Sequence, residues 1–213
     1  MRHIYNDLVL ALSFCMTAVP SESTTRPTPS RLLQQPRIVG GADAKRNEFP
    51  YFVDLGGKCG GTLIAPGVVM SAAHCREYLL PGITYATVNP LHVKDGQGTR
   101  LKIVERLFHP YYDDEWSSYD MMLLRLEEPI TMSATNASIK LIVNEDPDFP
   151  PDNVPLITIG FGELEQWSNR YPDILQKVEL DSVNLDICNQ TMFGEILDDS
   201  TLCAGTSTQR YRG

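Results

Sequence analysis

Apolar and polar positions follow one another in short runs between residues 51 and 183. The runs carry β-branched or bulky apolar residues, and Gly, Pro, Asn and Asp separate them. They predict seven strands, at residues 51–55, 61–64, 67–72, 101–108, 121–126, 155–160 and 175–183. Short strands at regular intervals are typical of a sandwich or a barrel. Because the sequence shows neither a long amphipathic helix nor an internal repeat, we predict an all-β protein made of two modules.

The first part of the chain has a different character. Residues 8–19 form an apolar run behind a short segment that contains Arg2 and His3, and small residues follow the run. This layout predicts a secretory signal peptide at residues 1–21. The stretch that follows, to residue 36, is rich in Pro, Ser and Thr and predicts a mobile leader. No later run approaches the roughly 20 apolar residues of a membrane span, so we expect a secreted, extracellular protein.

The charge of the chain limits its partners. The formal net charge is −9, and Lys and Arg do not cluster anywhere along the sequence. A protein that binds nucleic acid needs a basic surface to neutralise phosphates. We therefore expect no nucleic-acid partner, and we attribute the acidity to solubility.

Four cysteines remain once Cys15 has left with the signal peptide: Cys59, Cys75, Cys188 and Cys203. An even number in an oxidising compartment predicts disulfides, and four cysteines allow three pairings. The pairings between neighbours in the sequence are the simplest of the three. Zinc is the rival interpretation, but the chain has no C-x₂-C pair and no second histidine nearby. We expect neither a metal nor a cofactor.

His74 is the histidine with the most specific setting. A predicted strand leads into it, and Cys75 follows it directly. A serine-type hydrolase needs a base that takes the proton of the nucleophile and a buried carboxylate that orients this base. His74 is the candidate base, whereas His92 and His109 are expected to be structural.

Three stretches together resemble the chymotrypsin/trypsin-like serine proteases. They are RIVGG at residues 37–41, CGGTLIAPGVVMSAAHC at residues 59–75 and YDMMLLRL at residues 119–126. The resemblance implies two six-stranded antiparallel barrels, the first at residues 38–136 and the second, incomplete, at residues 137–213. It also implies that His74 is the general base and that Asp120 is the carboxylate that orients it.

The resemblance implies further features. The disulfides would be Cys59–Cys75 and Cys188–Cys203. Residues 22–37 would be a propeptide, and a trypsin-like protease would cleave after Arg37. The new α-amino group of Ile38 would then pair with a carboxylate beside the nucleophile and complete the active site.

The residues on both sides of Asp120 depart from the pattern of the family. Tyr119 stands where Asn usually precedes the aspartate, and Met121-Met122 stands where Ile-Ala usually follows it. Both changes are expected to alter the packing around Asp120 without removing its role.

The nucleophile of the family does not occur in these residues. It lies in a GDSGG stretch shortly after a CAG, and here the CAG at residues 203–205 is followed only by TSTQRYRG. Ser207 lies between two threonines and has no glycine pair after it that could form an oxyanion hole. We expect the nucleophilic serine to lie beyond Gly213, and a chain that ends at this residue to be inactive.

The sequence predicts a fragment or truncated form of a secreted trypsin-like serine endopeptidase that acts on proteins or peptides. The alternative is a non-catalytic protease homologue that acts by binding a protease or another protein, and a non-functional pseudogene product is the remaining possibility. Two Asn-x-Ser/Thr sequons, at Asn136 and Asn189, are possible glycosylation sites.

Overall fold

A computed structural model describes residues 41–79, 85–93, 97–113, 118–130, 150–164, 170–191 and 200–205. Several predicted features lie outside the described residues: the signal peptide at residues 1–21, the propeptide at residues 22–37, the cleavage site between Arg37 and Ile38, the sequon at Asn136, and Ser207. None of the described helices is long and apolar enough to cross a membrane.

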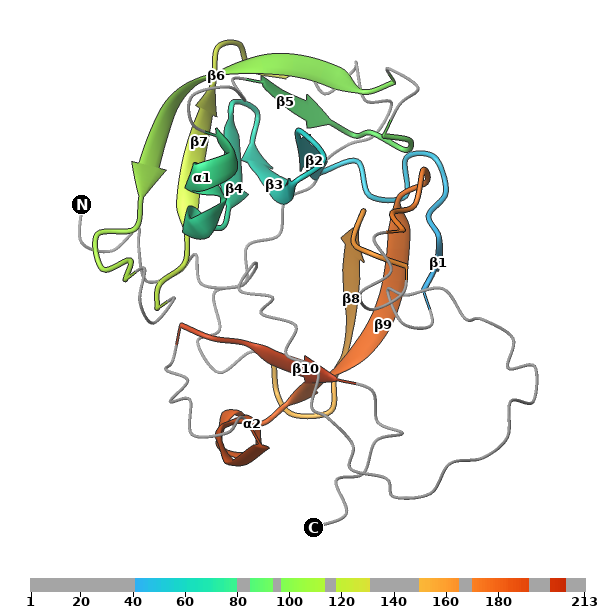
Figure 1. Ribbon diagram of the computed structural model, residues 1–213, viewed down its shortest axis with the longest axis vertical. Coiled ribbons are helices and arrows are strands. Elements are labelled where there is room, and N and C mark those ends of the chain that lie inside the picture. The colour runs from blue at the N-terminus through green and yellow to red at the C-terminus, as the bar shows by residue number, and fades with distance from the viewer. Residues whose placement is uncertain are drawn as a thin grey trace.

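Six antiparallel strands close into a barrel in the order β2-β3-β4-β7-β6-β5 (Figure 1). Their bounds are β2 (Phe52–Leu55), β3 (Cys59–Ala65), β4 (Val68–Ser71), β5 (Tyr85–Val88), β6 (Thr99–Phe108) and β7 (Met122–Leu126). Closure pairs both edges of each barrel strand, so the barrel leaves no free strand edge. A rigid frame of this kind can hold side chains from distant parts of the sequence in a fixed relation.

The side chains that alternate inward fill the barrel. Met122, Leu124 and Leu126 of β7 are buried, whereas Arg125 between them is exposed. Burial of one such side chain contributes on the order of 1.5–3 kcal/mol. The turn from β2 to β3 is built from Gly56 and Gly57, which adopt positive φ angles of 70° and 69°. The alternation along β7 explains why this strand could be predicted from the apolar pattern.

The remaining strands form a four-stranded sheet around β9 (Gln176–Val183). β9 pairs antiparallel with β1 (Ala42–Asp43), β8 (Pro155–Gly160) and β10 (Cys203–Gly205). Ser182 in β9 donates a hydrogen bond to the Pro151 carbonyl (2.6 Å) and accepts one from the Val154 amide (2.9 Å). These bonds fix the connection into β8 on the sheet.

Several contacts hold the sheet together and join it to the barrel. Residues of the segment that precedes the barrel reach β9, where the Gln176 amide donates to Asp43 Oδ1 at 2.7 Å and Lys177 pairs with Glu48. Phe52 of β2 packs edge-to-face on Phe161, which follows β8, with ring centroids 5.7 Å apart. An apolar cluster lies between the barrel and the sheet. It is formed by the buried side chains of Ala44, Phe49, Phe52 and Leu175.

The predicted fold class is confirmed, since the structure is mostly β and contains a closed six-stranded barrel. All seven predicted strands are present, and β1, β5, β10, the short helices η1 (Ala73–Cys75) and α1 (Arg76–Leu79), and α2 (Leu185–Thr191) are additions. A second barrel and the domain boundaries at residues 38–136 and 137–213 stay predictions. Although β1 falls within the first range, it pairs with β9 in the other sheet.

Candidate active site

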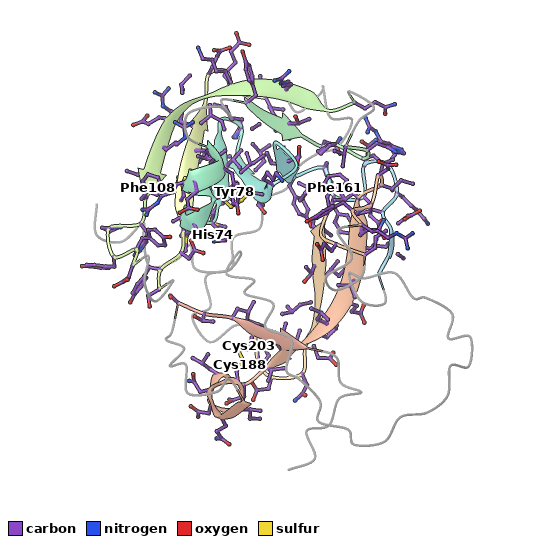
Figure 2. All side chains as sticks on the ribbon, viewed as in Figure 1. His74, Tyr78, Phe108, Phe161, Cys188 and Cys203 are labelled. Atoms are coloured by element: carbon purple, nitrogen blue, oxygen red, sulfur yellow. A yellow bond between two sulfur atoms is a disulfide. The ribbon has the colours of Figure 1, made fainter. Side chains whose placement is uncertain are left out.

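His74 lies at the end of β4, where the chain turns out of the barrel. The backbone of Ala72 is still extended, and the η1 turn begins at the next residue. Ala73 is completely buried, so a larger side chain there would collide with the core. The side chain of His74, in contrast, is 55% exposed. In Figure 2 it lies on the side of the barrel nearest β10.

The disulfide Cys59–Cys75 joins the beginning of β3 to the η1 turn. It closes a loop of 16 residues, which in the chain-entropy account adds about 3 kcal/mol to the free energy of unfolding. Because Cys75 follows His74 directly, this covalent bond restrains the backbone that carries the imidazole. The second disulfide, Cys188–Cys203, ties α2 to β10. Both pairs are the ones that the family resemblance implied.

The second side chain of the site belongs to Asp120, which lies two residues before β7 begins. Its side chain is 4% exposed. The backbone of Tyr119, the residue before it, has a left-handed φ of 50°. This unusual conformation turns the chain sharply as it enters β7.

The two side chains form a close pair. His74 Nδ1 lies 2.6 Å from Asp120 Oδ2, and the backbone N–H of His74 donates to Asp120 Oδ1 at 2.8 Å. Since an ionised carboxylate can only accept, the ring must carry its proton on Nδ1. Nε2 then has a free lone pair, which can accept a proton from a substrate or a nucleophile.

The pair shifts the acidity of both groups. The hydrogen bond to Asp120 raises the pKa of His74 above its usual 6.5, although burial opposes this change. Burial by itself would raise the pKa of Asp120, but the hydrogen bonds from the side chain and backbone of His74 outweigh it, and the pKa falls below its usual 3.8. The carboxylate is therefore ionised at neutral pH, and the imidazole is a stronger base than a free histidine.

Cys59, His74 and Cys75 bring three potential metal-ligand atoms within 4.8 Å of one another. Both sulfur atoms belong to the disulfide, so neither is a thiolate that could bind a metal. This cluster is therefore a histidine beside a disulfide and not a metal site.

The structure also describes His92 and His109, the two histidines that were predicted to be structural. His92 forms an isolated bridge with Ile174, two residues before β9 begins. The ring of His109 is stacked parallel on Tyr119, with ring centroids 4.8 Å apart. Asn189, in the second sequon, lies in α2 and is half-buried.

Sequence reasoning missed one contact near the site. The backbone N–H of Tyr119 donates to Ser200 Oγ at 3.0 Å, although 81 residues separate the two in the chain. No local signal in the sequence marks Ser200 as a partner of Tyr119.

Within the described part of the chain, no serine hydroxyl is hydrogen-bonded to Nε2 of His74.

A comparison with known protein families identifies one match, the family described as trypsin, over residues 38–212. The chain belongs to the trypsin family. Its relatives include chymotrypsin-like elastase family member 1 of Canis lupus familiaris, which is 32% identical over 181 residues, covering 79% of this chain and 69% of the relative.

Two other relatives of the trypsin family have similar identities. A trypsin of Saccharopolyspora erythraea is 32% identical over 79% of this chain and 73% of its own length. Trypsin 5G1 of Aedes aegypti is 30% identical over 93% of this chain and 76% of its own length. Because it belongs to this family, the chain is related to serine proteases. A protease family implies proteins as substrates.

Proposed function

We propose that the chain is the part of a secreted serine endopeptidase that carries the general base, His74, and the carboxylate that orients it, Asp120. The observation that carries the proposal is the two-point contact between them, 2.6 Å at the ring and 2.8 Å at the backbone. A histidine held in this way has one tautomer and one orientation, which is what proton transfer in acyl chemistry requires.

In the proposed reaction, Nε2 of His74 takes the proton of a serine hydroxyl while the serine oxygen attacks the peptide carbonyl. The imidazolium that forms is stabilised by the ionised Asp120, which stays deprotonated. The ring then gives its proton to the nitrogen of the departing amine. Water repeats the sequence on the acyl-enzyme, and no cofactor takes part.

We place the serine and the donors of the oxyanion hole in a segment beyond residue 213. Loss of the nucleophile alone costs about 10⁶ in kcat in subtilisin, an unrelated protease with the same triad. A polypeptide that ends at Gly213 is therefore expected to be inactive. Sequencing the transcript past the codon for Gly213 tests this point. An in-frame Gly-Asp-Ser-Gly-Gly is expected, and a stop codon there would overturn the proposal in favour of a role in binding.

We also propose that the protein is secreted as a precursor and activated by a trypsin-like protease that cuts between Arg37 and Ile38. Two observations support this proposal. The disulfides Cys59–Cys75 and Cys188–Cys203 suit an oxidising compartment. β1 begins at Ala42, only a few residues after Ile38 in the sequence, and its pairing with β9 anchors this described segment on the second sheet.

The experiment that tests the function uses the complete precursor and limited digestion with trypsin. N-terminal sequencing should give Ile-Val-Gly-Gly, and the digested protein should hydrolyse peptides and react with a fluorophosphonate probe. The His74→Ala variant should be cleaved at the same bond and stay unreactive. If the digested wild type neither hydrolyses peptides nor binds the probe, the endopeptidase function is wrong.

A further inference from the structure

Tyr119, the residue directly before Asp120, has a backbone conformation that needs support. Its φ of 50° is left-handed, which costs roughly 1–2 kcal/mol for a residue with a side chain. Such conformations persist where surrounding contacts fix them, and they concentrate at functional sites. The contacts of Tyr119 therefore show what holds the chain as it enters Asp120.

The ring of Tyr119 is fixed from the barrel. It stacks on His109 with centroids 4.8 Å apart and an interplanar angle of 4°, and Tyr111 meets it edge-on at 5.7 Å. The backbone N–H of His109 donates to the carbonyl of Met121 at 2.9 Å. His109 thus contacts the residue before Asp120 through its ring and the residue after Asp120 through its backbone.

The backbone of Tyr119 is fixed from the other part of the molecule. Its N–H donates to Ser200 Oγ at 3.0 Å. Ser200 lies shortly before Cys203, which belongs to β10 and is bonded to Cys188. β10 in turn pairs with β9. The hydrogen bond therefore links the turn before Asp120 to the second sheet.

The direction of the Asp120 carboxylate depends on this turn. His74 uses both carboxylate oxygens, so a rotation of Asp120 would disturb two hydrogen bonds at once. A displacement of about 1 Å in a catalytic arrangement can reduce the rate about 100-fold. The contacts on both sides of Tyr119 oppose such a displacement.

We propose that Tyr119 and Ser200 are positioning residues: the ring of Tyr119 on His109 and its N–H on Ser200 hold Asp120 in the direction that orients His74. The inference rests on the proposed function of this pair. Its consequence is that the barrel carries the base and the carboxylate, while the second sheet controls how well they are aligned.

The first test is made on the chain of 213 residues and needs no catalysis. NMR follows the pKa of His74 and the downfield resonance of its Nδ1 proton in the wild type, Ser200→Ala and Tyr119→Asn. Asparagine accepts a left-handed backbone but lacks the ring. In both variants the pKa of His74 should move towards 6.5 and the resonance should shift or broaden. Tyr119→Phe keeps the ring and should resemble the wild type.

Ser182→Ala is the matched control. Ser182 also accepts a hydrogen bond from a backbone N–H, that of Val154, at 2.9 Å, but it fixes the connection to β8 instead of the turn before Asp120. It should lower the free energy of unfolding and leave the pKa of His74 unchanged. An unchanged His74 in both Ser200→Ala and Tyr119→Asn, or an equal change in Ser182→Ala, would overturn the inference.

The second test is kinetic and uses the activated complete enzyme. Ser200→Ala should lower kcat by about 10- to 100-fold with little change in KM. In an Asp120→Asn background the same substitution should have almost no further effect on kcat, because residues that act through one another are not additive. Equal losses in both backgrounds would contradict a role through Asp120. If the wild type is inactive but His74 responds as described, the endopeptidase function fails and the positioning role stands.

Discussion

Both carboxylate oxygens of Asp120 are held by one residue, His74, although 46 residues separate them in the chain. One oxygen accepts from the backbone of His74 and the other from its ring. The carboxylate therefore fixes the position of the η1 turn and the tautomer of the imidazole together. Substitution of Asp120 should therefore affect both the position of the η1 turn and the tautomer of His74.

Asp120→Asn should leave the barrel folded and abolish most of the activity. An amide cannot accept a hydrogen bond at both of its terminal atoms, so the ring loses the partner that keeps its proton on Nδ1. We expect kcat to fall by about 10⁴, the magnitude known for this substitution in the chymotrypsin-like template of the triad. The measurement is kcat of the activated enzyme, with Asp181→Asn on β9 as the control that should keep its activity. A loss smaller than about 10-fold would contradict the role assigned to Asp120.

The pH dependence of activity follows from the raised pKa of His74. The proposed mechanism requires neutral His74, so kcat/KM should rise with pH through an acid limb whose midpoint lies above 6.5. Removal of the carboxylate should move this midpoint downwards. The measurement is kcat/KM against pH for the wild type and for Asp120→Asn, and equal midpoints in the two proteins would contradict the prediction.

Stability should depend on pH through the same pair. Because the folded pKa of His74 is raised, its contribution is fully present below 6.5 and is lost as the pH rises through the folded pKa. The folded pKa of Asp120 is lowered, so its contribution is present above 3.8 and is lost as the pH falls through the folded pKa. The difference in melting temperature between the wild type and His74→Ala should therefore be greatest between these limits. A difference that does not vary with pH would contradict this expectation.

Removal of the disulfide next to the base should affect both stability and function. In the double variant Cys59→Ser, Cys75→Ser, the free energy of unfolding should fall by about 2–4 kcal/mol. The η1 turn that carries His74 then relies on packing alone, so kcat should fall as well. Urea denaturation and kcat of the same preparation provide the two measurements. Unchanged activity in a measurably destabilised variant would show that the disulfide does not position the base.

Gly61 tests why two glycines follow Cys59 at the beginning of β3. A Cβ atom at this position would lie 2.8 Å from Val69 Cγ1 and 3.1 Å from the Met70 carbonyl. Both neighbours are buried in the barrel, so Gly61→Ala should lower the free energy of unfolding by about 1–3 kcal/mol. Gly162→Ala has open space around the new methyl group and should change it by less than about 0.5 kcal/mol. Similar effects of the two substitutions in denaturant titrations would contradict this explanation.

Local pattern was sufficient to predict the seven strands, because each is a short run of β-branched or bulky apolar residues between turn residues, and β7 also alternates between buried and more exposed side chains. The same information could not predict β1 and β10, which are two and three residues long, or β5, which buries only two small side chains, Ala86 and Val88. Such strands bury too few side chains to leave a pattern. They form because neighbouring strands offer backbone partners: β9 pairs with β1 and β10, and β2 and β6 pair with β5.

The candidate site was predictable to the extent that it follows short motifs. His74 and Asp120 could be named from the sequence around each residue and from the resemblance to the family. The hydrogen bond from Tyr119 to Ser200 could not, because it joins positions 81 residues apart, and neither residue type requires such a partner. Contacts of this kind result from the tertiary fold as a whole.

The pairing of β1 with β9 has a consequence for the order of events during synthesis. Asp43 and Gln176, which join the two strands through their side chains, are 133 residues apart. At translation rates of about 5–20 residues per second, the first strand leaves the ribosome on the order of ten seconds before its partner is made. All strands of the barrel are synthesised within this interval. The nascent chain can therefore complete the barrel early, whereas the pairing of β1 with β9 must be a late step.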